Sequence, residues 1–316
     1  MLNPTWLVEG AWADVESSPT GKSIYAMRFP QWHKDVQRWT STICEIDSNG
    51  KILRTINISG PRDVPSMLNV MSVGHNNGVA FVASRLWGDT VHLFDSDGAA
   101  IWTRQFAAVN RVSVANIDGD STDEILVGTQ KGLIAMRLDG TPSWHATLGN
   151  VRRAVLLPPY HGPALLAAHL SSDLAVLDLN GHLVRRISAS YEVMDITARG
   201  GILSPPVIIA IDGPTIRAFN LDGTQLWAVR DKSPQIHTVR LSSMQISPDG
   251  RWIAAALKGG LLLVYDASDG TPTASLSEPA LNYGSLTWLT GSDGRLQLVA
   301  AAAGGLQCLE VASHLD

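Results

Sequence analysis

The chain has 316 residues, of which 45% are apolar and 17% charged, and its formal net charge is −5 with a pI near 6.0. This composition supplies a large core, and the acidic balance argues against a general electrostatic grip on nucleic acid. Two cysteines, Cys44 and Cys308, are too few and too far apart for a disulfide framework or a cysteine zinc site.

The N-terminal stretch, MLNPTWLVEG, has no basic segment followed by an apolar core, so it does not read as a signal peptide. No run of about 18 apolar residues predicts a membrane span. We therefore expect a cytoplasmic location, with a secreted protein whose leader has been removed as the alternative. The stretch loosely echoes 221–229, LDGTQLWAV, which predicts that residues 3–9 form a strand.

A short turn theme recurs along the chain, in which Asp or Asn precedes glycine between two apolar strands. Its copies are EIDSNGKILRT (45–55), LFDSDGAAIWTR (93–104), MRLDGTPSWHA (136–146), LDLNGHLVRR (177–186), FNLDGTQLWAV (219–229) and YDASDGTPTAS (265–275). The turn glycines are separated by 48, 42, 41, 42 and 47 residues. A period in the forties is typical of a four-stranded propeller blade. We expect two positive-φ positions in each turn.

The repeat predicts an all-β, seven-bladed β-propeller of four-stranded antiparallel blades, forming one domain over 1–316. The expected blades are 11–58, 61–106, 107–148, 149–189, 190–230, 231–276, and 280–316 plus 2–9. In the last of these the N-terminal strand completes the blade and closes the ring, which removes two exposed sheet edges.

Three tryptophans, Trp102, Trp144 and Trp227, each lie four residues beyond a turn glycine. We expect them to pack against the neighbouring sheet. The copies LDGTPSW and LDGTQLW resemble the pyrroloquinoline-quinone (PQQ)-type propeller repeat, and 246–270 resembles the WD-repeat propellers. Such folds serve as enzymes, receptors and scaffolds alike. Quinoproteins of the dehydrogenase type hold their cofactor beside a vicinal disulfide, and the absence of adjacent cysteines here argues against PQQ.

The segment RFPQWHKDVQRW (28–39) interrupts the first blade with an aromatic, basic stretch that is long for a hairpin. Exposed Trp32 and Trp39 would contact a protein partner or a ligand. Alternatively, the two rings fold down as a lid over the central channel.

An acidic loop, NIDGDSTDE, follows a strand at residues 116–124. Its oxygen ligands would be Asn116, Asp118, Asp120, the Thr122 carbonyl and Glu124. The pattern resembles the calcium loop of FG-GAP repeats and the first half of an EF-hand loop, with Ser121 in place of a glycine and Asn116 in place of an acid. We expect a structural calcium ion, with Asp123 pointing outward. The alternative is a solvated acidic turn.

The innermost strand of each blade would line the channel. Its members predict a pocket for an anionic or aromatic ligand, with a water-filled channel of paired charges as the alternative. The predicted ligand-binding residues are Arg111, Arg153, Arg240, Trp12 and Trp288. No catalytic motif is present.

Two functions follow from these residues. The first is a non-catalytic propeller that binds a protein partner or a small anionic or aromatic ligand at one face of the ring. The alternative is a propeller enzyme of the lyase, hydrolase or cyclase type, with His237 and Asp195 or Glu192 as its acid and base.

Overall fold

The repeated turns form hairpins of one kind. In five of them the glycine N–H donates to the carbonyl three residues earlier, as Gly181 does to Asp178 at 3.1 Å. The Asp178 carboxylate accepts the N–H groups of Asn180 and His182 at 2.9 and 2.8 Å. Only the glycine has a positive φ, +82° at Gly181, so the expectation of two such positions was wrong. The Asp178 side chain thus binds the backbone of the turn, and a single left-handed glycine completes it.

The computed structural model describes most of the chain. The described residues are 2–61, 64–74, 78–85, 87–188, 195–201, 204–212, 215–230, 241–257, 260–278, 284–302 and 304–311. Within these ranges every regular element is a strand, which confirms the all-β prediction. The chain forms two compact units, residues 1–59 with 233–316 and residues 60–232.

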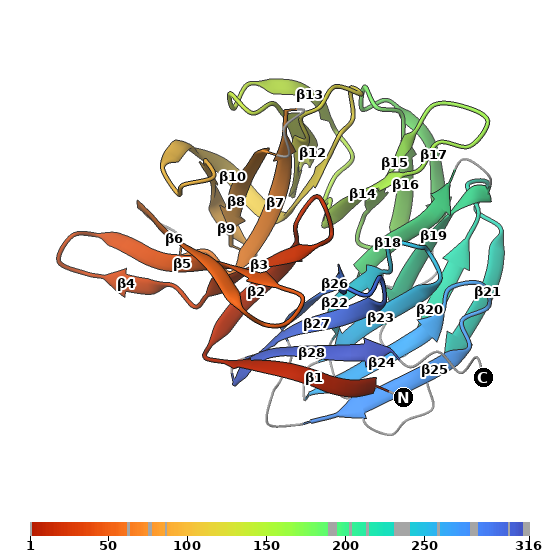
Figure 1. The fold of residues 1–316 in the computed structure, drawn as a ribbon. Coiled ribbons are helices and arrows are strands. Elements are labelled where there is room, and N and C mark those ends of the chain that lie inside the picture. The colour runs from red at the N-terminus through yellow and green to blue at the C-terminus, as the bar shows by residue number, and fades with distance from the viewer. Residues whose placement is uncertain are drawn as a thin grey trace. The chain divides into compact units, whose positions relative to one another are not determined.

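The first unit contains three antiparallel sheets, and in one of them residues 2–9 pair with residues 305–311 (Figure 1). One sheet has the order β2-β3-β5-β4, with β6 on the other side of β5. The others have the orders β22-β23-β24-β25 and β1-β28-β27-β26. The strands are β1 (Leu2–Glu9), β2 (Trp12–Ser17), β3 (Ser23–Arg28), β4 (Gln31–His33), β5 (Arg38–Asp47), β6 (Ile52–Pro61), β22 (Leu241–Ile246), β23 (Trp252–Leu257), β24 (Leu261–Asp266), β25 (Pro272–Ser277), β26 (Ser285–Thr290), β27 (Leu296–Ala302) and β28 (Gly305–Val311).

The N-terminal strand completes the last sheet, as predicted. β1 pairs with β28 in antiparallel register from Leu2 opposite Val311 to Glu9 opposite Gly305. The apolar alternation of β28 continues across this pair, because Leu2 joins the buried cluster that contains Leu309. The pairing therefore covers the edge that β28 would otherwise expose.

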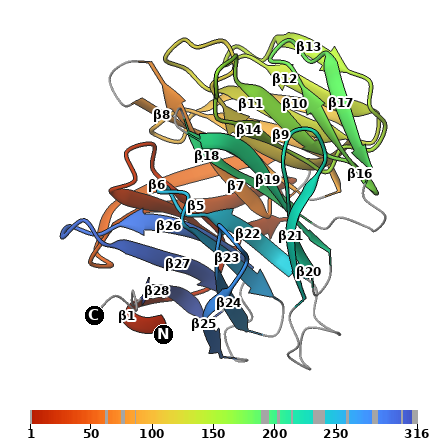
Figure 2. The ribbon, with the colours of Figure 1, turned by 90° about the vertical axis from the view of Figure 1, so that its right-hand side faces the viewer.

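The second unit contains a seven-stranded sheet and two four-stranded sheets (Figure 2). The long strand β10 pairs with β9 through its first half and with β11 through its second half, so the large sheet divides there into two four-stranded halves. No linker separates the blades expected to meet at 106–107. The strands are β7 (Met67–Val73), β8 (Gly78–Ser84), β9 (Gly88–Phe94), β10 (Ala100–Ala115), β11 (Glu124–Thr129), β12 (Gly132–Met136), β13 (Pro142–Ala146), β14 (Arg153–Leu157), β15 (Leu165–His169), β16 (Asp173–Leu177), β17 (Leu183–Ser188), β18 (Asp195–Gly201), β19 (Ser204–Asp212), β20 (Thr215–Phe219) and β21 (Gln225–Arg230).

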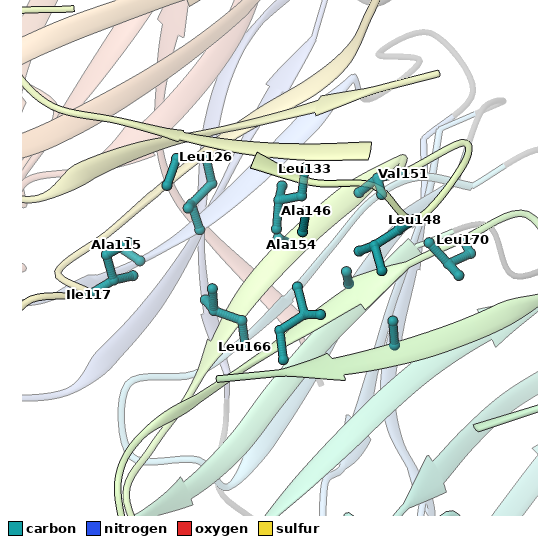
Figure 3. Close-up of a cluster of buried hydrophobic side chains, with 14 residues drawn as sticks. Ala115, Ile117, Leu126, Leu133, Ala146, Leu148, Val151, Ala154, Leu166 and Leu170 are labelled. Carbon is teal, nitrogen blue, oxygen red and sulfur yellow. The ribbon is translucent and has the colours of Figure 1, made fainter. Parts of the chain in front are cut away.

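Neighbouring groups of strands pack face to face through alternating small and large apolar side chains. Figure 3 shows the cluster between β10–β13 and β14–β17, where Leu126 and Leu133 face Leu166 across buried alanines. Small residues on the facing strands let the two sheets approach closely, and the leucines fill the remaining space.

Tryptophans connect consecutive groups of strands. The Trp102 indole N–H donates to the Leu138 carbonyl at 2.9 Å, and Trp144 donates to Leu179 at 2.8 Å. Each acceptor lies two residues before the turn glycine of the next group. Trp6 makes the same contact with Ser48 at 2.9 Å, within the first unit. The third predicted copy, Trp227, has a buried indole nitrogen with no acceptor among the described residues.

Candidate functional site

Charged side chains predicted for the inner strands meet in the second unit. The second half of β10 lies beside β14, and β14 lies beside β18 (Figure 2). The Ser113 hydroxyl on β10 donates to the Ala154 carbonyl on β14 at 2.7 Å, which sets the spacing between these strands. Arg111 shares its strand face with Ser113 and points to the same seam. The fold therefore brings Arg111, Arg153 and Asp195 together, and their charges pair with one another, which was the alternative to a ligand pocket.

The Asp195 carboxylate lies between the two guanidinium groups. Arg153 Nη1 is 2.9 Å from Oδ1 and 3.1 Å from Oδ2, whereas Arg111 Nη1 is 3.4 Å from Oδ2. The Ile196 N–H also donates to Oδ1, at 2.9 Å. The Asp195 side chain is 4% exposed, that of Arg153 11% and that of Arg111 25%. Arg153 is thus the close partner, and Arg111 is the distant and more accessible one.

These contacts decide the protonation state of Asp195. Burial acts to raise the pKa of the carboxyl, but attraction to Arg153, and then to Arg111, outweighs burial and holds the pKa below its usual value. A carboxylate held in this state is a poor proton donor at neutral pH. The acid–base hypothesis therefore loses support at Asp195, the one member of its set that the structure describes, since His237 and Glu192 lie outside the described residues. The predicted ligand-binding residue Arg240 also lies outside them.

The four tryptophans proposed as ligand contacts differ sharply in exposure. Trp12, Trp39 and Trp288 are 1%, 0% and 3% exposed, whereas Trp32 is 37% exposed. Trp12 donates to the Val8 carbonyl at 3.2 Å. Rings buried to this degree act in packing, so only Trp32 presents a surface to a partner. The expectation that Trp39 lies exposed on a loop was wrong, because it belongs to β5 and points inward.

The acidic loop is held by hydrogen bonds between its own side chains and backbone groups. Glu124 is 4% exposed, and its Oε2 accepts the Ile117 N–H at 2.9 Å. Asp118 Oδ1 accepts the Asp120 N–H at 3.0 Å, and Asp120 Oδ1 accepts the Thr122 N–H at 2.5 Å. Asn116 contributes both atoms of its amide. Its Oδ1 accepts the Gly119 N–H at 2.8 Å, and its Nδ2 donates to the Asp120 carbonyl.

Asp123 points into the protein and not outward as expected. Its N–H donates to the Ser72 carbonyl at 2.9 Å, and its Oδ2 accepts the Ser72 N–H at 2.7 Å. The loop is therefore tied to β7. In the part of the chain that the structure describes, no three His, Cys, Asp or Glu side chains lie close enough together to hold a metal ion.

A ribbon extends from the sheet of β2–β6. β3 pairs with β5 up to Met27, and β4 continues the ladder from Gln31, so the two strands of the β4–β5 hairpin project together (Figure 1). Trp32 lies opposite Trp39 in this ladder. Phe29 and Val36 are 52% and 58% exposed. The predicted insertion is therefore an ordered hairpin with an apolar surface.

A groove of about 400 Å³ lies at the base of this hairpin. It is lined by Arg28, Phe29, Gln31, Thr40, Ser41, Thr42, Asn57, Ile58 and Ser59. Most of these side chains are polar and uncharged, and no sequence motif marks them. The strand alternation of β5 and β6 could have indicated them only once the register of that pair was known.

Known structures share this fold. A crystal structure of the C-terminal WD40 domain of Sif2 matches with a TM-score of 0.63 at 14% identity, covering 99% of each chain. A structure of the WD40 β-propeller domain of Doa1 matches with a TM-score of 0.70 at 10% identity, covering 99% of this chain and 98% of that chain. These likenesses establish the β-propeller fold.

The remaining comparisons address sequence. No curated protein matches the chain. The family model PQQ_2, described as "Outer membrane protein assembly factor BamB", matches residues 130–291, just over half of the chain. The described part of the structure contains no helix that is long and apolar enough to span a membrane. The family match confirms the resemblance to PQQ-type repeats, and the chain belongs to this family.

Proposed function

We propose that this chain is a non-catalytic β-propeller that binds a protein partner through the β4–β5 hairpin. One observation carries the proposal: Trp32 and Val36 are exposed beside the cations Lys34 and Arg38 on a ribbon that extends from its sheet. The family description, an assembly factor, supports a role in holding proteins together.

The chemistry of the hairpin indicates what kind of surface it binds. Exposed tryptophan is the side chain most often found at the energetic centre of a protein interface. Lys34 and Arg38 outnumber Asp35 and give residues 31–39 a net charge of +1, with neutral histidine, within a chain of net charge −5. The complementary partner surface is an apolar patch bordered by carboxylates, which would also speed association.

The exposed side chains carry the proposed recognition. β5 pairs with β3 and β4 on one edge and with β6 on the other, so a strand added to this sheet would have to pair with an end strand such as β4 and not with β5. The groove at the hairpin base offers Gln31, Asn57 and Ser59 as hydrogen-bonding groups beside the Phe29 ring. Its volume is sufficient for a loop of the partner.

Site-specific photo-crosslinking tests this proposal. p-Benzoylphenylalanine replaces Val36 on the hairpin or Leu183 on β17, which is 48% exposed and serves as the matched control. In extracts of the source cells we expect one defined product from position 36 that is absent from position 183. The product should disappear when Trp32→Ala is added. The same products from both positions, or a product unaffected by Trp32→Ala, would contradict the proposal.

We also propose that the acidic loop binds a structural calcium ion. Its donors are hard oxygens, the ligand type that calcium prefers, and they need not include three acidic groups in contact, because two carboxylates, Asp118 and Asp120, would combine with the neutral oxygens of Asn116 and Thr122. Oδ2 of Asp118 and of Asp120 has no partner within the described ranges, because the loop hydrogen bonds use Oδ1. After chelator treatment, about 1 mM calcium should raise the melting temperature of the wild type and not that of Asp118→Asn/Asp120→Asn. Equal shifts in both proteins would refute the site.

A further inference from the structure

Arg111 is a partly exposed guanidinium with few contacts to the described residues. Its side chain is only 25% exposed, yet its one contact with the described residues is Nη1 to Asp195 Oδ2 at 3.4 Å. A guanidinium carries five N–H donors. Arg111 therefore retains most of its hydrogen-bonding capacity at a position that a dissolved ligand can reach.

The groups around Arg111 already hold Asp195. Arg153 approaches both carboxylate oxygens, and the Ile196 N–H binds Oδ1. His169 lies opposite Arg153 in the β14–β15 ladder and adds to the positive surroundings of the carboxylate. Asp195 is thus satisfied chiefly by Arg153 and the backbone, so Arg111 is not needed as its main partner and has donors left for a ligand.

We propose that Arg111 binds the oxyanion of a ligand, a carboxylate or a phosphate group, at the seam between β10 and β14. The Arg153–Asp195 pair acts as a positioning element that holds Arg111 by its Nη1 atom and leaves the rest of the fork for the ligand. Such a fork matches two oxygens of one anion in parallel, which a lysine cannot do. This site is separate from the β4–β5 hairpin and does not depend on the proposed protein docking.

Isothermal titration of the full chain with inorganic phosphate and with glutarate tests the inference, at constant ionic strength set by sodium chloride. We expect saturable binding of at least one anion and a loss of at least tenfold in affinity in Arg111→Gln. Arg137→Gln, which removes an exposed arginine from the β12–β13 turn, is the matched control and should bind as the wild type does. Tighter binding of phosphate would assign the site to phosphoryl groups, and tighter binding of glutarate to carboxylates.

A second variant keeps the test informative if Arg111→Gln does not fold. Arg111→Lys retains the charge without the fork, and we expect it to weaken binding by several-fold. Unchanged affinity in a folded Arg111 variant would overturn the inference. So would the absence of saturable binding of either anion at about 10 mM.

Discussion

The contact between Trp144 and the Gly181 turn makes the tryptophan docking directly testable. Gly181 has φ +82°, and a Cβ added there would lie 2.5 Å from Trp144 Cε3 and 2.8 Å from Cδ2. Gly149 has a nearly identical φ of +84°, and a Cβ there would meet nothing within 4 Å. Gly149→Ala therefore measures the cost of the left-handed backbone alone, and Gly181→Ala adds the collision with the indole.

The expected magnitudes follow from the two terms. Alanine in the left-handed region costs about 1–2 kcal/mol. Displacing the indole also breaks the Trp144–Leu179 hydrogen bond, worth about 1 kcal/mol, and exposes part of the ring, worth about 1 kcal/mol more. Gly181→Ala should therefore destabilise by about 2 kcal/mol more than Gly149→Ala. For a chain of 316 residues that difference corresponds to roughly 3 °C in melting temperature.

Thermal unfolding followed by circular dichroism measures both variants. A double-mutant cycle isolates the contact, since the excess cost of Gly181→Ala should vanish when Trp144→Ala is already present. Equal destabilisation by Gly149→Ala and Gly181→Ala would refute the reasoning, as would additive effects of Gly181→Ala and Trp144→Ala.

Three further changes have defined outcomes. Asp195→Asn removes the carboxylate shared by two arginines and should lower the free energy of unfolding by about 3 kcal/mol at pH 7. Because the pKa of Asp195 is lowered in the fold, this stabilisation is present above the unfolded pKa of about 3.9 and is lost as the pH falls through the folded pKa. A difference in unfolding free energy between variant and wild type that stays constant from pH 7 to pH 3 would contradict the ion pair. Cys44 and Cys308 are buried, and burial raises the pKa of the Cys308 thiol to about 11. Neither thiol should therefore react with Ellman's reagent before the protein unfolds. Rapid labelling of the native protein would contradict this burial. Asp123→Ala leaves the Ser72 N–H without its acceptor and should lower the free energy of unfolding, measured in urea, by about 1–3 kcal/mol. Asp123→Asn keeps an acceptor oxygen and should lower it much less. Equal losses in the two variants would exclude this hydrogen bond.

Local chemistry made much of the fold predictable from sequence. Repeated Asp/Asn–Gly turns at a period in the forties identified the strand pairs, and a tryptophan at a fixed offset identified the docking of Trp102 and Trp144. The weak echo between the N-terminus and residues 221–229 correctly indicated the pairing of β1 with β28. Each of these signals is short-range or repetitive, so it can be read without knowledge of packing.

Side-chain direction was harder to predict, because it depends on strand register and on what covers each face. Trp32 and Trp39 lie opposite each other in one ladder, yet one is exposed and the other buried. Asp123 turns inward because Ser72 of β7 offers both a donor and an acceptor. A shift of one residue in a strand reverses every side chain, and the sequence carries no local mark of that register.

The candidate site was predicted in part for the same reason. Placing Arg111, Arg153 and Asp195 on inner strands indicated that their charges would lie near one another, either around a ligand or paired among themselves. The sequence did not indicate that Arg153 Nη1 would lie 2.9 Å from Asp195 Oδ1 while Arg111 Nη1 lies 3.4 Å from Asp195 Oδ2. The residues that line the groove beside Phe29 form no sequence motif. The groove lies where the pairing of β5 passes from β3 to β4.

The central claim, that the β4–β5 hairpin binds a protein partner, is tested most directly by one affinity comparison. The purified partner identified by crosslinking at position 36 is titrated against the wild type, Trp32→Ala/Val36→Ala and the exposed apolar control Leu183→Ala/Val184→Ala on β17. Loss of an interface tryptophan typically costs 2 kcal/mol or more, so the hairpin variant should bind at least about 30-fold more weakly, and the control should bind as the wild type does. Equal affinity of the hairpin variant and the wild type would contradict the claim.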